Sequence, residues 1–196
     1  MPRSEEQVPT LTGGDEWPKG FFFGRSTVRE HGASSLQRVT LMKKDIDPRM
    51  HSAEHILNQT MVRSFGCGRC FSSHIEKKKS KCDYRFDRPL SEEEVDGIMS
   101  KVNEVIRSNL PVLEEFVARG EAEKRFNLSR LPEDAGDPVR IISIGDYDAC
   151  PCIGPHVNLT AEIGQFRIIS STFQDGVLRI RFRLAGLTKE IPNAGL

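Results

Sequence analysis

The sequence has no excess of charge of either sign and no long hydrophobic segment. Its 196 residues include 28 lysine and arginine residues and 28 aspartate and glutamate residues, so the formal net charge is zero. This balance excludes the strongly basic footprint of a dedicated nucleic-acid-coating protein, while a local basic patch is compatible with it. No apolar stretch approaches the roughly 20 residues of a membrane-spanning helix. We therefore expect neither a membrane anchor nor a DNA partner.

The beginning of the sequence also lacks a targeting signal. The first twenty residues, MPRSEEQVPTLTGGDEWPKG, contain no apolar core of the kind found in secretory signal peptides. Residues 1–19 are predicted to form a polar, flexible leader. Residues 20–196 are predicted to form a single domain, because the length of the chain is typical of one domain. A chain of this length also buries enough surface to fold without disulfide bonds. The expected location is the cytoplasm.

Cysteine is sparse and unevenly placed. The five cysteines form one group at positions 67, 70 and 82 and another at positions 150 and 152. An odd, clustered set of cysteines in a reducing compartment indicates metal binding or thiol chemistry rather than disulfide bonds.

Two helices are marked by the residues at their ends. Asp47 can cap a helix whose first position is Pro48, and Gly66 is suited to end that helix. The sequence SEEE at residues 91–94 has the pattern of a capping box, and an apolar stripe with a period of 3.6 residues follows it. Pro111 is expected to end this second helix.

The predicted strands do not alternate regularly with the helices, which indicates an α+β fold with a mainly antiparallel sheet packed on helices. A hairpin is predicted across residues 174–176, because the Asp-Gly pair there favours a tight turn between two strand-like runs. Strands are predicted at residues 21–30, 34–44, 82–87, 139–145, 165–173 and 177–186.

Two histidines stand four residues apart in "MHSAEHIL", residues 50–57. On a helix, His51 and His55 project from the same side, about one turn apart. That side lies opposite the apolar residues of the helix, whereas a core histidine would be expected within the apolar stripe. The pair is either half of a metal site or two solvent-facing side chains.

The segment "CPCIGPH", residues 150–156, offers the other half of a metal site. Cys152 and His156 have the spacing C-x3-H in a turn-rich loop that follows a predicted strand. With His51 and His55 they supply three imidazoles and one thiolate, a donor set that suits Zn²⁺. Cys152 alone could be a small buried apolar side chain. The combined pattern predicts a pocket between helix and loop that binds one Zn²⁺ per chain.

Two other metal patterns are present. "HSAEH" matches H-x-x-E-H, in which Glu54 would be the general base of a small metallopeptidase, although such enzymes use a carboxylate as third ligand. The segment "CGRCFSSH", with one more cysteine eight residues later, contains either a structural zinc site or free thiols. The candidate ligands of this second zinc are Cys67, Cys70, His74 and Cys82.

These motifs together resemble the editing domain, or second additional domain, of alanyl- and threonyl-tRNA synthetases and of free-standing AlaX-type trans-editing proteins. "MHSAEHIL" is similar to the family's H-[TS]-A-x-H-[IL]-L, and "CIGPHVNLTAEIGQF" to its C-G-G-T-H-V-x-x-T-x-E-I-G-x-F. "SEEEVDGIMSKVNEVIRSNLPV" resembles the helix between them. The likeness extends over residues 36–184.

The resemblance implies hydrolysis of a wrong amino acid from the 3′ end of a mischarged tRNA. The expected substrates are serine or glycine on tRNA-Ala, or serine on tRNA-Thr. It also implies that the zinc is held by His51, His55, Cys152 and His156. Because 196 residues leave no room for ATP-binding or anticodon-reading segments, we expect a free-standing, zinc-dependent deacylase.

The sequence departs from the family's motif next to the expected metal ligands. The family's C-G-G-T-H is C-I-G-P-H here. Two residues before Cys152, where the synthetases commonly have an acidic residue, stands Cys150. Asp148 is the carboxylate that could orient the substrate in its place. An alternative function follows from this departure, namely a non-catalytic, zinc-containing module that binds tRNA or another partner.

Two groups of basic residues are candidates for contacts with tRNA phosphates, each of which would add to a salt-dependent affinity. The first group lies just before the strand predicted at residues 82–87 and consists of Lys77, Lys78, Lys79 and Lys81. The second group alternates with apolar residues, so that it points off one face of a strand, and consists of Arg179, Arg181 and Arg183. Either group could instead be an ordinary solvated surface.

Overall fold

The computed structural model describes residues 46–185, apart from residues 130, 133 and 134. The predicted leader and the strands predicted at 21–30 and 34–44 lie outside the described residues. Within the described residues the α+β prediction is confirmed, and every strand pair is antiparallel. The strands form two sheets rather than one.

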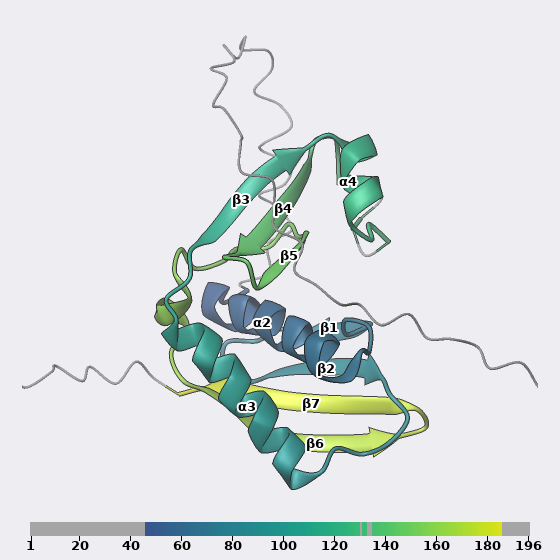
Figure 1. Ribbon diagram of the computed structural model, residues 1–196, viewed down its shortest axis with the longest axis vertical. Helices are drawn as coiled ribbons and strands as arrows, with labels where there is room; N and C mark the ends of the chain where they lie inside the picture. The colour runs from purple at the N-terminus through teal and green to yellow at the C-terminus, as the bar shows by residue number, and fades with distance from the viewer. Residues whose placement is uncertain (1–45, 130, 133–134, 186–196) are drawn as a thin grey trace, which may run out of the picture.

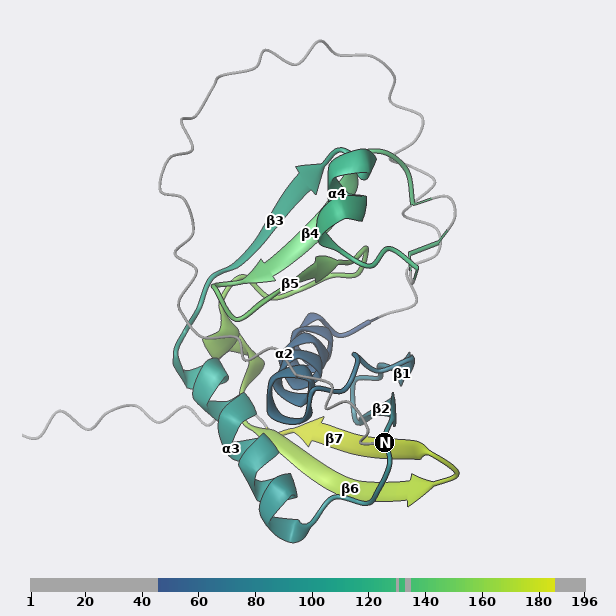
Figure 2. The same ribbon diagram turned by 45° about the vertical axis from the view of Figure 1, so that its right-hand side comes forward.

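A central helix, α2 (Pro48–Phe65), lies between the two sheets (Figures 1 and 2). One sheet has the strand order β1-β2-β7-β6 and the other the order β3-β4-β5. Helix α3 (Glu92–Arg107) packs beside α2 and against β6. The remaining elements are β1 (Ser72–His74), β2 (Ser80–Arg85), β3 (Val112–Val117), α4 (Arg119–Arg125), β4 (Val139–Ile144), β5 (Asp148–Pro151), the 3-10 helix η2 (Thr160–Ile163), β6 (Phe166–Gln174) and β7 (Val177–Leu184).

Local residues define both ends of α2, as predicted. The Asp47 side chain accepts hydrogen bonds from the backbone N–H groups of Arg49 and Met50, and Pro48 occupies the first turn. Gly66 has a φ of 62°, the left-handed conformation that ends a helix at little cost to glycine. The sequence therefore sets the length of the helix that carries the two histidines.

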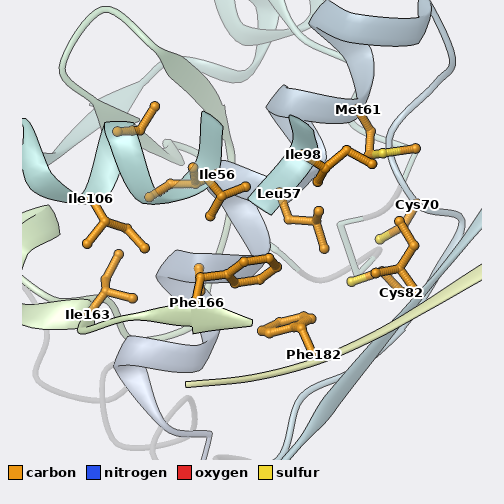
Figure 3. Close-up of a cluster of buried hydrophobic side chains, with 14 of the residues drawn as sticks. Ile56, Leu57, Met61, Cys70, Cys82, Ile98, Ile106, Ile163, Phe166 and Phe182 are labelled. Carbon is orange, nitrogen blue, oxygen red and sulfur yellow. The ribbon is translucent and has the colours of Figure 1, made fainter. Parts of the chain in front are cut away.

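Helix α2 is buried on both of its long sides. Its apolar residues, such as Ile56 and Leu57, pack in the main core with residues of α3, β6 and β7 (Figure 3). Its polar residues Ser52, His55 and Asn58 are also buried, and His55 is only 3% exposed. The solvent-facing alternative therefore does not hold for His55. Because buried polar groups need partners, the surroundings of these side chains decide what they can do.

The second helix begins with the predicted capping box. The Ser91 hydroxyl accepts a hydrogen bond from the Glu94 N–H at 3.2 Å, and the Glu94 carboxylate accepts one from the Ser91 N–H at 2.8 Å. Pro111 does not end the helix as expected. The helix ends at Arg107, because Asn109 has already adopted a left-handed φ of 50°.

The predicted hairpin joins β6 and β7. Its two turn residues, Asp175 and Gly176, have φ angles of 50° and 74°, which matches the positive values that a tight hairpin turn needs. Residues of β7 pair with β2 on the other side, with Cys82 opposite Ile180. This register places the apolar residues of β7 on the face that packs against the helices.

A small second core lies between α4 and the three-stranded sheet, where Ala122 of α4 packs against Val139 and Ile141 of β4. The sequence did not predict α4, and it did not predict β1, β3 or β5. The helices found between residues 46 and 185 all lack the combination of length and apolar character that crossing a bilayer demands.

We predict that Ser91→Ala lowers the free energy of unfolding by about 1 kcal/mol, because it leaves a helix N–H without its capping partner. Urea denaturation followed by circular dichroism measures this difference. Ser100→Ala is the control, since Ser100 is an exposed residue in the interior of the same helix. Equal stabilities of the two variants would contradict the prediction.

Candidate metal centre

Four side chains from two distant segments meet beside the N-terminal half of α2. His51 and His55 come from the helix, and Cys152 and His156 come from the loop that follows β5. Each residue offers a ligand atom, and these four atoms lie within 4.8 Å of one another. The Cys152 Sγ is 3.5 Å from the His51 Nε2 and 3.4 Å from the His156 Nε2.

The loop is held in place by the strand pair β4 and β5. The Cys152 N–H donates to the Arg140 carbonyl at 3.1 Å. The Arg140 guanidinium donates to the carbonyls of Cys152 and Gly154, at 3.0 and 2.8 Å. These bonds fix the backbone on both sides of the thiol, so the position of the ligand loop depends on a residue of β4 that the motif does not contain.

Gly154 is required by the close approach of His51. A Cβ atom added at Gly154 would lie 2.2 Å from the His51 Cε1 and 2.5 Å from its Nδ1, which no real side chain tolerates. Ile153, by contrast, is 51% exposed, so a large side chain is accommodated at that position. The sequence C-I-G-P-H therefore retains the one glycine that the histidine packing needs.

Each histidine has a partner for the ring nitrogen that does not face Cys152. The His51 Nδ1 lies 3.1 Å from the Pro155 carbonyl, so it is the donor there. The His156 Nδ1 lies 3.1 Å from the Ser52 hydroxyl. The His55 Nδ1 lies 3.5 Å from the Asp148 carboxylate. Partners of this kind orient imidazole ligands of metals.

The four residues fit a zinc ion. Ligands bonded to tetrahedral Zn²⁺ at about 2.0–2.3 Å stand about 3.3–3.8 Å apart, and the two distances from the Cys152 Sγ fall in that range, at 3.4 and 3.5 Å. Burial alone would raise the pKa of Cys152, but hydrogen bonds from His156, His51 and His55 outweigh burial and lower the pKa to about 3. Cys152 is therefore a thiolate at neutral pH, the form that binds metals.

The imidazoles differ in their readiness to bind. Burial, helped by the charges of His55 and His51, lowers the pKa of His156 to about 4, so this ligand is neutral at pH 7. Burial also tends to lower the pKa of His55, but the charge of Cys150 and the hydrogen bond with Asp148 outweigh it and raise that pKa. Metal binding at His55 would therefore release a proton.

Asp148 is buried and held by an arginine that the sequence analysis did not select. Arg69 donates to both carboxylate oxygens of Asp148, at 2.6 and 3.2 Å. Burial tends to raise the pKa of Asp148, but the hydrogen bond from His55 and the charge of Arg69 lower it. The carboxylate is thus positioned to orient His55. Cys150 is half-buried, with its Sγ 3.4 Å from the His55 Nδ1.

The candidate ligands of the second zinc do not all come together. Cys70 and Cys82 are buried and form a group with Glu54. Cys67 is half-buried and its thiol donates to the Met61 carbonyl. His74 is exposed and lies 2.7 Å from Glu76.

Glu54 does not join the four ligands of the first group. Its carboxylate accepts hydrogen bonds from Asn58 at 2.7 Å and from the Cys70 thiol at 3.3 Å. A general base of a metallopeptidase would have to face the metal and its water. This geometry gives no support to the metallopeptidase alternative.

The candidate phosphate-binding residues differ in their exposure and in whether an acidic side chain already pairs with them. Lys77, Lys78 and Lys79 are exposed between β1 and β2, and Lys81 is half-buried in β2. The Arg179 guanidinium donates to both carboxylate oxygens of Asp83 at 2.7 Å. In the same strand, Arg183 is exposed and Arg181 half-buried.

The fold and the site define a class of protein: an α+β domain in which three histidines and a cysteine surround a position suited to a divalent metal. Residues 139–181 match a family model described as the threonyl and alanyl tRNA synthetase second additional domain. Together with the sequence relatives described next, this match confirms the likeness to the editing domain of alanyl- and threonyl-tRNA synthetases that the motifs predicted.

The similar curated proteins are alanine–tRNA ligases. The chain is 32% identical over 164 residues to that of Fervidobacterium nodosum, which covers 83% of this chain and 19% of the ligase. It is 40% identical over 126 residues to the ligase of Leptospira biflexa, and the matched region covers 61% of this chain and 13% of that ligase. It is 33% identical over 165 residues to the ligase of Aeropyrum pernix, and the matched region covers 81% of this chain and 18% of that ligase. The chain thus spans less than a fifth of the length of these relatives.

We predict that Gly154→Ala weakens zinc binding about 10–100-fold, because it displaces His51 from its orienting partner. Competition with a chromophoric chelator measures the affinity. Gly68→Ala is the matched control, since a Cβ atom there meets nothing within 4 Å. Unchanged affinity in Gly154→Ala would show that His51 is not a ligand.

Proposed function

We propose that the protein is a zinc-dependent aminoacyl-tRNA deacylase that acts in trans. Its substrates are serine or glycine on tRNA-Ala, or serine on tRNA-Thr. The observation that carries this proposal is the meeting of His51, His55, Cys152 and His156, with ligand atoms within 4.8 Å, in a domain of the editing family.

The residues around the pocket suggest how an aminoacyl ester is handled. Zn²⁺ bound there would supply positive charge that polarises the ester carbonyl or the attacking water. Cys150, half-buried beside His55, is the side chain that we assign to contact the aminoacyl group. Asp148 is a positioning residue, because its carboxylate is held by Arg69 and turned toward the His55 ring. Fixed positions of this kind lower the barrier by orientation.

A second candidate function is a non-catalytic zinc module that binds tRNA or a partner. One observation favours it: four protein ligands complete a tetrahedral set, which is typical of structural zinc sites. In that case the zinc would hold the β5 loop on α2 and the pocket would have no turnover.

Deacylation assays with serine- and glycine-charged tRNA-Ala and serine-charged tRNA-Thr separate the two candidates. We expect release of the amino acid from at least one of them, while alanyl-tRNA-Ala and threonyl-tRNA-Thr are spared. Binding of zinc and tRNA without any release would instead favour the non-catalytic module.

We predict that Cys150→Ala lowers kcat/KM in this assay about 100-fold, as expected when the contact that orients a substrate is removed, with zinc content unchanged. Cys67→Ala is the control, because this half-buried thiol donates to the Met61 carbonyl and belongs to no group of candidate metal ligands within the described residues. Equal activities of the two variants would remove Cys150 from the site.

For the tRNA, we propose phosphate contacts on the outer face of the four-stranded sheet. Apolar residues of β7 point into the main core, so the alternating arginines point away from α2. Lys81 lies directly opposite Arg181 in the register, and the exposed lysines 77–79 come just before β2 in the chain. Arg179 contributes less, because Asp83 neutralises it.

We predict that the double variant Arg181→Gln, Arg183→Gln weakens tRNA binding and reduces the slope of log K against log salt by about 0.7–0.9 per lost phosphate contact. Fluorescence anisotropy over a salt series measures the slope. The double variant Lys124→Gln, Arg125→Gln on α4, where Lys124 pairs with Glu121 and Arg125 with Glu115, is the charge-matched control. A slope that changes equally in both variants would contradict the proposed face.

A further inference from the structure

A second cluster of potential metal ligands lies on the side of α2 that faces the four-stranded sheet. Glu54 belongs to α2, Cys82 belongs to β2, and Cys70 lies in the segment between α2 and β1. Their ligand atoms lie within 4.8 Å of one another. Both thiols are fully buried, and Glu54 is 5% exposed. Figure 3 shows the two sulfur atoms near each other at the edge of the main core.

The backbone holds this cluster together without any disulfide. The Cys70 N–H donates to the Asn58 side-chain oxygen at 2.8 Å, and the Phe71 N–H donates to the Asp83 carbonyl at 2.9 Å. The first bond ties Cys70 to the helix, and the second ties its neighbour to β2. The three ligands are therefore brought together by the fold before any ion binds.

The carboxylate of the cluster is oriented in the manner of a metal ligand. Asn58 donates to the Glu54 Oε1 at 2.7 Å. The distance from the Cys70 Sγ to the same oxygen is 3.3 Å, close to the spacing of two ligands on a tetrahedral ion. Burying a carboxylate is costly unless a positive charge compensates it, and a divalent cation among these ligands would supply that charge.

The unpaired hydroxyl of Tyr84 is a second observation, independent of the spacing of the three ligand atoms. Tyr84 stands two residues after Cys82 on the same face of β2, fully buried. Its hydroxyl oxygen has no hydrogen-bond partner within the described part of the chain. Because residues two apart on a strand point to the same face, the Tyr84 phenol lies on the side of the sheet that carries the Cys82 thiol. A buried hydroxyl left unpaired beside three ligands indicates a missing neighbour.

We propose that Glu54, Cys70 and Cys82 bind a second, structural divalent ion of the zinc class, with the Tyr84 hydroxyl at the fourth position. Binding replaces the two thiol protons, which leave to solvent, by one metal ion. The ligand set differs from the one predicted from sequence, since Glu54 and Tyr84 take the places of Cys67 and His74. Helix α2 is then held by one ion toward β5 and by another toward β2.

Elemental mass spectrometry of the full chain, purified without chelators, measures its metal content and tests the proposal. We expect two ions per chain in the wild type, one in Cys152→Ala, one in Cys82→Ser and two in the control Cys67→Ser. A wild type with a single ion that Cys152→Ala abolishes would overturn the proposal. Activity plays no part in this readout, so it stands or falls separately from the deacylase proposal.

Cobalt substitution keeps the test valid if Cys82→Ser fails to fold. Thiolate-to-cobalt charge-transfer absorption scales with the number of thiolate ligands, and the two sites together contain three. Cys152→Ala should therefore keep about two thirds of the wild-type absorption. Complete loss of the band in Cys152→Ala would overturn the second site. So would a thiol titration of the unfolded, metal-free wild type that finds Cys70 and Cys82 joined in a disulfide.

Discussion

The double-sided burial of α2 is the constraint on which the rest of the structure depends. An ordinary amphipathic helix turns its polar side to water, but here the three-stranded sheet and the β5 loop cover that side (Figure 2). His55, Ser52 and Asn58 are buried there or at its edges. Each of them must be paired, since a buried polar group without a partner destabilises the fold by about 1–3 kcal/mol. The partners come from residues 70 and 148–157, which explains why the ligand loop and the helix are found together.

Two arginines extend this constraint to the four residues of the candidate metal centre. Arg140 fixes the carbonyls of Cys152 and Gly154, and Arg69 fixes the carboxylate that faces His55. Both act through bidentate or paired hydrogen bonds, which define position more narrowly than a single contact with lysine would. The four ligands are thus held by groups that never touch the metal position. This arrangement is what a preorganised centre requires, whether the ion takes part in hydrolysis or only fastens the loop.

The sequence predicted the parts of the fold that depend on local chemistry. The caps at Asp47 and Ser91, the turn at Gly176 and the spacing of the four ligands are all local signals, and the capped helices and the hairpin are found as predicted. The parts that depend on register were missed. Nothing in "CGRC" reveals that Cys70 meets Glu54 and Cys82 while Cys67 turns toward Met61, because that depends on where the chain leaves Gly66 and how β2 pairs with β7. Arg69 was missed for the same reason.

The replacement of an acidic residue by Cys150 can now be weighed in its surroundings. Asp148 already supplies a negative charge next to His55, and Arg69 compensates that charge. An acidic side chain at position 150 would place two carboxylates beside the same imidazole. The thiol is also softer and less hydrated than a carboxylate, so it attracts an α-ammonium group more weakly and tolerates an apolar neighbour better. Under the proposed deacylase function, recognition of the aminoacyl group would therefore depend more on shape, on the Cys150 contact and on fixed backbone groups than on a salt bridge to its amino end.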